Sequence, residues 1–313
     1  MNNFDYDSDI VIVGAGPAGL TAAIYGCRAN LSVIILDKTS PGGKIITTAT
    51  IENYPGYESI TGPDLGLKMF TQAQQLGSKF IFNEATNIIT TDNYHFVELK
   101  NNKVIRAKAI ILATGMVNRQ IGCPGELDFF HKGISYCAIC DGAFHKGLPI
   151  AVVGSGLSAV EESIYLSDIG SEIFLISNKP KFKCDQLSIK RLNRIKNIKV
   201  FMNTDTLSFN GKDSLESVTI KNQLTGEQSD ISVHGAFIFI GFLPVCPTVN
   251  SKSILSSTTN FIDVDNNCST NIPGLFAAGD IVSKKIRQIS TAVGDGTIAA
   301  LSAIDYINNK IWN

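Results

Sequence analysis

The sequence predicts an α/β fold built from two similar units, because one pattern of strand, glycine turn, helix and strand occurs twice. The first copy, DIVIVGAGPAGLTAAIYGCRANLSVIILD, covers residues 9–37, and the second, IAVVGSGLSAVEESIYLSDIGSEIFLIS, covers residues 150–177. A chain of 313 residues is long enough for two domains of ordinary size. Each copy is therefore expected to form the core of its own domain.

Composition and charge exclude several classes of protein. The formal net charge is −1, so nothing indicates a surface for nucleic acid or for an anionic membrane. Hydrophobic residues make up 44% and charged residues 18%, which is typical of a globular protein. The first residues, MNNFDYDSD, are acidic and polar where a signal peptide is basic and then apolar. No apolar run approaches the roughly 20 residues of a membrane-spanning helix, and we expect a soluble cytoplasmic protein.

The first copy carries a dinucleotide-binding fingerprint in its proper context. The apolar strand Ile10–Val13 leads into a turn with the spacing Gly-x-Gly-x-x-Gly. Gly14 permits the tight turn, Gly16 lets the backbone approach a pyrophosphate, and Gly19 lets the helix pack against the strand. Free N–H groups at the helix N-terminus bind phosphates, and Asp37 ends the second strand, where an acid can hydrogen-bond an adenosine ribose. The alternative is a glycine-rich turn without a ligand.

The second copy departs from the first at its selectivity position. It has Gly154, Gly156 and Ala159 at the three glycine positions, and Ser177 where the first copy has Asp37. Two such units suggest one flavin and one nicotinamide cofactor, so that cofactors carry the hydride chemistry and the protein orients them. Because Ser177 is not an acid, it cannot make the bidentate ribose contact that favours NAD.

The segment that begins at Ser177, SNKPKFKCD, determines how a 2′-phosphate could be bound. Such a site normally uses arginine just beyond the strand, but here Lys179, Lys181 and Lys183 follow and the first arginine is Arg191. Lysine can bind phosphate as a point charge, although it lacks the planar fork of arginine. The alternative is that these lysines lie on a solvated turn.

One cysteine pair has a meaningful spacing. Cys137 and Cys140 form a Cys-x-x-Cys motif in GISYCAICDGAFHKG, residues 133–147. The chain has seven cysteines, and an odd number in a cytosolic protein argues against a fully paired disulfide framework. The five cysteines outside the motif suit the role of small buried hydrophobic residues: Cys27, Cys123, Cys184, Cys246 and Cys268.

Three explanations of the Cys-x-x-Cys motif compete. A zinc site needs four ligands, and the nearest additional ones, Cys123, His131 and His145, match no familiar zinc spacing. Two idle cysteines are a second explanation. The third is a redox pair, since this spacing lowers the pKa of one thiol from about 8.5 toward neutrality and a reduced flavin can deliver two electrons to the disulfide.

The acid beside the motif also has two explanations. Asp141 follows the second cysteine directly and can protonate the thiolate that leaves during disulfide exchange. Alternatively, Asp141 is a turn residue before Gly142, because Asp-Gly commonly forms turns.

Taken in order, the segments GAGPAGLTAAIY, PGGK, ENYPGY, TGPDL, ILATG, GISYCAICDG, GSGLSAVEES, GLFAAGDI and RQISTAVGDG resemble low-molecular-weight thioredoxin reductases over nearly the whole chain. These are FAD-dependent members of the pyridine nucleotide-disulfide oxidoreductase family. The resemblance implies two Rossmann-like dinucleotide-binding domains, the second inserted into the first. The FAD-binding domain would comprise residues 1–117 and 248–313, and the NAD(P)H-binding-like domain with the redox pair residues 118–247.

The resemblance also implies roles for particular residues. Cys140 would face the flavin, Cys137 would attack thioredoxin, and Asp141 would act as the acid. Asp280 would bind the ribityl chain, and the remaining expected FAD residues are Gly14, Gly16, Pro17, Ala18, Gly19, Asp37, Gly42, Gly43, Lys44, Thr48, Asn53, Ala113, Thr114, Gly115, Gly279, Arg287, Gln288 and Ile289. Gln288 and Ile289 would open a helix against the isoalloxazine, where a helix N-terminus favours negative charge. The expected NADPH residues are Gly154, Gly156, Ser158, Ala159, Lys179 and Lys183.

The nucleotide half departs from the family pattern. Members that use NADPH carry a His-Arg-Arg run with a further arginine four positions on, and here Ser177, Asn178, Lys179 and Lys183 stand at these places. The glycine turn reads GSGLSA instead of Gly-Gly-Gly-Asp-Ser-Ala, and Lys44 stands where glutamine is common. NADPH is therefore the default donor, ferredoxin or a second flavin is the alternative, and a flavin electron carrier or redox sensor is the alternative of another class. The family further implies a homodimer.

Overall fold

The computed structural model describes residues 6–48, 51–249, 254–256 and 258–312, and the chain forms two compact units. The first unit comprises Met1–Val117 and Leu243–Asn313, and the second comprises Asn118–Phe242. The return to the first unit therefore comes at Phe242/Leu243, before the residue 247 at which the resemblance to the family places it. Residues 1–5, on which the expectation of no signal peptide partly rests, lie outside the described residues.

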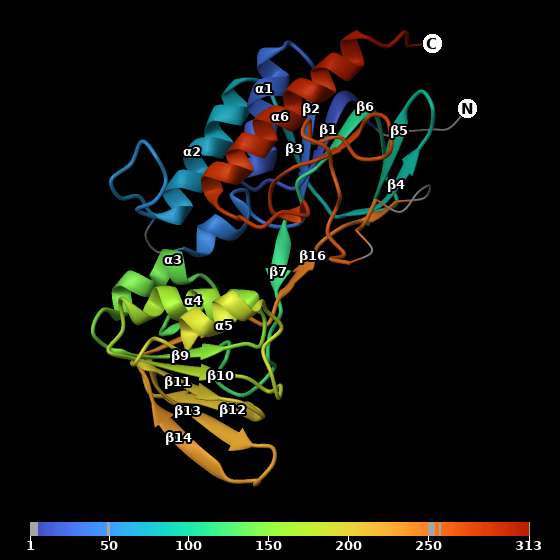
Figure 1. Cartoon of the computed structure of the whole chain (residues 1–313). Helices are drawn as coiled ribbons and strands as arrows, with labels where there is room; N and C mark the ends of the chain where they lie inside the picture. Colours follow the sequence, from blue (N-terminus) through green and yellow to red (C-terminus); the bar gives the residue numbers. More distant parts are fainter. Residues whose placement is uncertain (1–5, 49–50, 250–253, 257, 313) are drawn as a thin grey trace. The chain divides into compact units, whose positions relative to one another are not determined.

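An eight-stranded mixed sheet forms the centre of the first unit (Figure 1). Its strand order is β17-β4-β5-β6-β1-β2-β3, and β18 pairs with β6 outside this path. The strands β1, β2, β3 and β6 run parallel, whereas β4 and β5 form antiparallel pairs. The bounds are β1 Tyr6–Val13, β2 Val33–Asp37, β3 Lys79–Phe82, β4 Ala85–Thr90, β5 His95–Leu99, β6 Val104–Leu112, β17 Thr248–Val249 and β18 Leu275–Ala277.

Three helices of the first unit pack side by side, with α1 between α2 and α6 (Figure 1). They are α1 Pro17–Arg28, α2 Gly62–Gln75 and α6 Ile289–Asn308, and short 3-10 helices occupy η1 Gly43–Thr47 and η3 Gly279–Ile281. Successive side chains of β1 point to opposite faces of the sheet. Ile10 and Ile12 pack in the cluster that contains the helices, whereas Val11 and Val13 pack in the cluster on the other face. The continuous apolar run is thus explained by burial on both faces.

The second unit contains a five-stranded parallel sheet of order β11-β10-β9-β15-β8 and a three-stranded antiparallel sheet of order β12-β13-β14. The parallel strands are β8 Ile134–Ser135, β9 Pro149–Val153, β10 Glu172–Ile176, β11 Ile198–Phe201 and β15 Gly235–Ile238. The antiparallel strands are β12 Thr204–Gly211, β13 Leu215–Asn222 and β14 Gln228–Ser232. Two further strands, β7 Met116–Asn118 and β16 Phe242–Pro244, pair where the chain passes between the units.

The helices of the second unit are α3 Ala138–Asp141, α4 Leu157–Ser167 and α5 Gln186–Leu192, with the 3-10 helix η2 Gly142–His145. Ile150 and Val152 of β9 pack in the cluster that contains helix residues, and Ala151 and Val153 pack in the cluster with the antiparallel sheet. The predicted α/β fold with two Rossmann-like units is therefore confirmed. Among the described residues, no helix is long and apolar enough to cross a membrane.

His95 is a completely buried histidine in the core of the first unit. It begins β5, is 0% exposed, and has no hydrogen-bond partner at either ring nitrogen within the described part of the chain. A Cβ on Gly274 would lie 2.3 Å from His95 Nε2 and 2.8 Å from Cε1 of Tyr306, so the imidazole is tightly enclosed. This burial, together with the positive charge of Lys310, lowers the pKa of His95 to about 4.

We expect stability to fall as the pH drops below the unfolded pKa of 6.5, because the unfolded chain then binds a proton that folded His95 does not. The loss between pH 7.5 and pH 5 should be about 2 kcal/mol, since each pH step below that pKa costs about 1.4 kcal/mol until the folded group titrates. His95→Met should remove this contribution, and urea unfolding at the two pH values measures it. His131→Asn, at an exposed histidine with positive φ, is the matched control and should leave the pH dependence intact; an equal effect of both variants would contradict the assignment.

Candidate functional site

The glycine turn after β1 brings backbone segments into direct contact. Gly14 has φ +111°, and a Cβ there would lie 2.2 Å from the Ala113 carbonyl oxygen. A Cβ on Gly19 would lie 1.9 Å from the carbonyl oxygen of Gly14. In contrast, a Cβ on Gly16 would meet no protein atom within 4 Å. Gly14 and Gly19 are thus needed for packing, whereas the space beside Gly16 at the start of α1 is open to a ligand.

Asp37 ties the end of β2 to this turn. Its Oδ2 accepts a hydrogen bond from the Ala15 backbone N–H at 2.7 Å, and its Oδ1 accepts bonds from the N–H and hydroxyl of Thr39 at 2.8 Å each. A carboxylate can accept more than one bond at each oxygen, so Asp37 retains acceptor capacity for a ribose hydroxyl. Asp37, which is predicted to bind the ribose, therefore also has a structural role that the sequence did not indicate.

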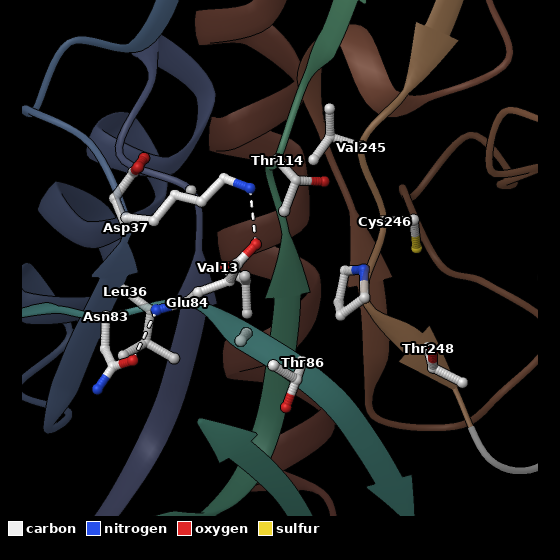
Figure 2. A pocket seen from close by; sticks show the side chains of 14 residues that line it. Val13, Leu36, Asp37, Asn83, Glu84, Thr86, Thr114, Val245, Cys246 and Thr248 are labelled. Atoms are coloured by element: carbon white, nitrogen blue, oxygen red, sulfur yellow. Dashed lines mark hydrogen bonds and ion pairs between the residues drawn. The ribbon is translucent and has the colours of Figure 1, made fainter. Parts of the chain in front are cut away.

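A pocket of about 320 Å³ opens at the carboxyl ends of the central strands of the first unit (Figure 2). The expected residues Gly14, Asp37 and Thr114 line it, and the Thr114 hydroxyl is buried with no hydrogen-bond partner among the described residues. Sequence reasoning missed two further segments that line the pocket, residues 83–86 and 245–248. These two segments belong to or adjoin strands β4 and β17, which pair with each other. Only the tertiary fold therefore brings the two segments together. The lining includes the Asp37 carboxylate and the backbone of the glycine turn, which are polar groups that fit a ligand such as an adenosine group.

The Gly-Gly-Lys segment, whose residues the family resemblance implies for FAD binding, lies against the glycine turn. The Gly42 N–H donates to the Ala15 carbonyl at 2.8 Å. A Cβ on Gly43 would lie 3.0 Å from the Cα of Gly16. Lys44 follows within η1, and its ammonium interacts electrostatically with Asp280. Thr48 closes η1 as its C-cap, and its carbonyl accepts a bond from the Gly62 N–H at 3.0 Å.

Asp280 stands at the centre of a cluster of charges in which Asp280, Lys284 and Arg287 are half-buried and Lys44 is more exposed. Burial raises the pKa of the Asp280 carboxyl, and the positive charges of Lys44, Lys284 and Arg287 oppose this rise. Burial also lowers the pKa of Lys44 and of Arg287, while the charge of Asp280 works in the opposite direction on both. Arg287 donates to the Asp280 carbonyl at 3.3 Å and lies 4.3 Å above the ring of Phe261. The cluster thus combines hydrogen-bond donors and an acceptor suited to a polyhydroxylated, phosphorylated ligand.

Helix α6 begins at Ile289 with Gln288 as its N-cap, where the family resemblance implies a helix start. The Gln288 N–H donates to the Thr291 hydroxyl at 3.1 Å, and the Asn53 amide donates to the Gln288 side-chain oxygen at 3.3 Å. Asn53 and Gln288 are far apart in sequence, so the structure brings two expected flavin-site residues together. A 20-residue helix presents a partial positive charge at this end.

The turn that carries Asp280 is held by an acid on α6. Asp295 accepts a hydrogen bond from the Gly279 N–H at 3.0 Å and pairs with Lys284 at 2.5 Å. A Cβ on Gly279 would lie 2.8 Å from the Cβ of Ala18, so this turn also packs against the start of α1. Together, the open glycine turn, the unpaired Thr114 hydroxyl and the charged cluster fit FAD as an extended ligand of the first unit.

The glycine turn of the second unit follows the same construction. A Cβ on Gly154 would lie 2.4 Å from the Phe239 carbonyl oxygen and 2.7 Å from the Cβ of Ala159. A Cβ on Gly156 would meet nothing within 4 Å. The Lys183 N–H donates to the Ser155 carbonyl at 2.8 Å, so the lysine segment folds back onto the turn. The open space at Gly156 and the N-terminus of α4, with Ser158 exposed in its first turn, fit a second dinucleotide.

Ser177 is not presented to a ligand. Strand β10 ends at Ile176, and Ser177 is 1% exposed, with its hydroxyl accepting a bond from the Lys179 N–H at 3.2 Å. Lys179 and Lys183 are both exposed beside the turn. Binding of a 2′-phosphate therefore has to come from flexible lysine side chains, which act as point charges.

Cys137 and Cys140 form a disulfide, with their Cα atoms 5.3 Å apart. Cys137 is the N-cap of α3, and the Cys140 N–H donates to the Cys137 sulfur at 3.3 Å. An N–H directed at this sulfur would stabilise its thiolate after reduction. The bond between the two sulfurs favours the redox explanation over two idle thiols.

Asp141 ends α3, and Ser135 connects it to the cysteine motif. The Ser135 hydroxyl donates to Asp141 Oδ2 at 2.5 Å and accepts a bond from the Cys137 N–H at 3.0 Å. Sequence reasoning missed Ser135, since a serine two residues before a cysteine carries no signal of its own. Next to it, Tyr136 donates to the buried Glu126 at 2.8 Å, and this contact anchors the strand end that leads into the motif.

The other five cysteines are poor nucleophiles, because burial raises the pKa of each thiol. The pKa reaches about 11 for Cys123, Cys246 and Cys268. Only Cys268 is fully buried, and the others are half-buried, so the expectation of small buried hydrophobic residues holds best there.

Comparison with known proteins gives a consistent relationship. The model of the pyridine nucleotide-disulphide oxidoreductase family matches residues 8–296. The chain is 45% identical over 312 residues to a thioredoxin reductase of Ureaplasma parvum, covering 100% of both chains. It is 40% identical over 304 residues to a thioredoxin reductase of Bacillus subtilis, covering 96% of this chain and 94% of that protein.

The same relationship holds in three dimensions. The crystal structure of thioredoxin reductase from Streptococcus pyogenes aligns with a TM-score of 0.92 at 36% identity, covering 98% of this chain and 100% of that one. A thioredoxin reductase from Giardia duodenalis aligns with a TM-score of 0.91 at 29% identity, covering 97% of this chain and 100% of that one. The chain therefore belongs to the pyridine nucleotide-disulphide oxidoreductase family and groups within it with the thioredoxin reductases.

Proposed function

We propose that this protein is an FAD-dependent thioredoxin reductase that passes two electrons through Cys137 and Cys140 to thioredoxin. The observation that carries the proposal is the Cys137–Cys140 disulfide at the start of α3, in the same unit as the second glycine turn. Full-length similarity to thioredoxin reductases supports it. NADPH is the proposed electron donor, and ferredoxin or a second flavin is the alternative favoured by the buried Ser177 and the absence of an arginine run.

The first unit would hold FAD through residues at its glycine turn, its pocket and its charged cluster. Gly16 leaves room for the pyrophosphate, Asp37 accepts from the ribose, and Asp280 accepts from the ribityl chain. When bound, FAD supplies the two electrons that open the disulfide. The second unit would hold NADPH at Gly156, with Lys179 and Lys183 near the 2′-phosphate.

The thiol chemistry follows from the surroundings of the cysteine pair. After reduction, the Cys137 thiolate attacks one sulfur of the thioredoxin disulfide, and the other sulfur leaves as a thiolate that Asp141 protonates. The Cys140 thiolate then attacks Cys137, which reforms the Cys137–Cys140 disulfide and releases reduced thioredoxin. The Cys140 N–H at 3.3 Å from the Cys137 sulfur supports Cys137 as the nucleophile. We further propose a homodimer located in the cytoplasm, where thioredoxin is kept reduced.

The two open glycines provide a matched pair of variants for the cofactor assignment. Gly16→Val and Gly156→Val each add a Cβ that meets no protein atom within 4 Å, and neither glycine has a positive φ, so both proteins should fold. Gly16→Val should purify colourless, because its side chain occupies the pyrophosphate space, whereas Gly156→Val should stay yellow but lose reduction by NADPH. Flavin absorbance and stopped-flow reduction measure both effects. Full FAD binding by the Gly16→Val protein would contradict the FAD site.

The cysteine pair should be essential and the other thiols dispensable. Cys137→Ser and Cys140→Ser should each reduce steady-state thioredoxin turnover to background while retaining FAD. Cys184→Ser is the matched control, since this half-buried cysteine lies in the same unit outside the motif, and it should keep most of the activity. Retention of turnover by either motif variant would show that the pair is not the route of the electrons.

The lysines that follow β10 test whether NADPH is the electron donor. Lys179→Ala combined with Lys183→Ala should reduce the preference for NADPH over NADH by about tenfold, because exposed charge-assisted contacts are weak and screened by salt. Lys181→Ala is the control within the same loop, and Km values for both nucleotides at low and high salt provide the measurement. If millimolar NADPH fails to reduce the flavin of the unmodified protein while dithionite succeeds, the alternative donor is correct.

A further inference from the structure

Ser135 occupies a position where one hydroxyl serves both the acid and the nucleophile of the cysteine site. It ends β8, is 4% exposed, and its oxygen lies within hydrogen-bond distance of three groups. These are Asp141 Oδ2 at 2.5 Å, the Cys137 N–H at 3.0 Å and the Cys137 carbonyl oxygen at 3.4 Å. Water is largely excluded from this hydroxyl, so its bonding is set by these neighbours.

The available donors and acceptors allow two arrangements that match the two protonation states of Asp141. When the carboxylate is ionised, the Ser135 O–H donates to Oδ2, and the Cys137 N–H donates to the serine oxygen. When the carboxyl is protonated, its O–H can donate to the second lone pair of the serine oxygen. The Ser135 O–H then turns to the Cys137 carbonyl, which lies at 3.4 Å. Neither state leaves the serine hydroxyl without a partner.

We propose that Ser135 is a positioning residue that holds Asp141 beside the cysteine pair in both protonation states and thereby makes proton transfer to the leaving thiolate efficient. This inference rests on the proposed function and assigns Ser135 no contact with substrate. Because rotation of one hydroxyl accommodates the loss of the proton, the Asp141 side chain does not have to move during the reaction.

The step that depends on Ser135 is the disulfide exchange between Cys137 and thioredoxin. A bond forms between Cys137 Sγ and one sulfur of the thioredoxin disulfide, and the sulfur–sulfur bond of thioredoxin breaks. The departing sulfur takes the bond pair and then the proton from Asp141. The Cys140 thiolate then attacks Cys137 Sγ, and the mixed disulfide breaks. The second thioredoxin sulfur leaves as a thiolate that takes a proton from solvent, so the cysteine pair is oxidised and thioredoxin is reduced by two electrons.

Of the residues that the structure describes, two histidines and a tyrosine are the other titratable groups near Asp141 and its neighbours. On η2, His145 interacts electrostatically with Asp141; burial lowers the pKa of this histidine and the charge of Asp141 opposes that effect. The charge of His234 also acts on His145. On α4, which packs against α3, Tyr165 lies near Gly142. Within the described part of the chain, Ser135 is the residue that hydrogen-bonds the Asp141 carboxylate, which is why we assign the positioning role to it and not to His145.

The test compares two disulfide substrates with different leaving groups. Ser135→Ala should lower thioredoxin reduction about tenfold, a fraction of the roughly 10²–10⁴-fold that general acid catalysis can supply. The same variant, pre-reduced with dithionite, should react at the wild-type rate with 5,5′-dithiobis(2-nitrobenzoate), whose leaving thiolate needs no proton at neutral pH. Ser135→Thr keeps the hydroxyl and should restore most of the thioredoxin activity.

A double-mutant cycle separates positioning from general damage. In an Asp141→Asn background, Ser135→Ala should cause no further loss of thioredoxin reduction. The ratio of the double-variant rate to the Asp141→Asn rate should therefore not vary with pH. FAD absorbance and thermal unfolding verify that each variant is folded. An unchanged rate in Ser135→Ala, an equal loss with both substrates, or an equal loss in the Asp141→Asn background would overturn the proposal. If the wild-type protein reduces no thioredoxin with any donor, the proposed function itself fails instead.

Discussion

Direct contact between backbone segments at the two glycine turns is the constraint on which the arrangement of both sites depends. In the first unit a Cβ on Gly14 would lie 2.2 Å from the Ala113 carbonyl, and in the second unit a Cβ on Gly154 would lie 2.4 Å from the Phe239 carbonyl. Any side chain at these positions would separate the central strands from the loops that cross them. The contacts bring the N-termini of α1 and α4 to the strand ends, where phosphates can bind.

The two units use this shared frame for different chemistry. The first unit gathers opposite charges around Asp280, and the partial burial of Asp280 makes its carboxyl sensitive to the neighbouring charges. Such a cluster suits a large polar ligand that replaces the water around it. The second unit instead places two sulfurs and one carboxyl on the short α3, and hydrogen bonds from Ser135 and the Cys140 N–H set their geometry. Charge therefore dominates the first site, and hydrogen bonding dominates the second.

Features that depend on local sterics could be predicted from the sequence. Contacts between segments that are distant in the sequence could not. The two strand–turn–helix units were predictable, because glycine spacing and apolar runs carry that information, whereas the start of α6 at Ile289 was implied by the family resemblance. The burial of Ser177 was not, because it depends on how the loop after β10 folds back. The Ser135 bond to Asp141 links β8 to α3, and no pattern of residue types reveals such a contact.

The pocket of the first unit shows the same limit. Asp37 was expected at the cofactor site from its position at the end of a strand and Thr114 from the family resemblance, but Asn83 and Cys246 line the pocket because β17 pairs with β4 across the sheet edge. Sequence separation of this kind leaves no local signal. The half-buried state of four of the five other cysteines was also unpredictable, since each depends on the packing around one loop or helix.

The most direct test of the central claim is to trap the mixed disulfide between this protein and thioredoxin. Cys140→Ser leaves Cys137 as the attacking thiol without its resolving partner, and the adduct can be identified by mass spectrometry after reaction with oxidised thioredoxin. We expect a covalent adduct through Cys137 that dithiothreitol releases, and little adduct in Cys137→Ser. An adduct of equal yield through Cys140, or none in either variant while the wild-type protein still reduces thioredoxin, would contradict it.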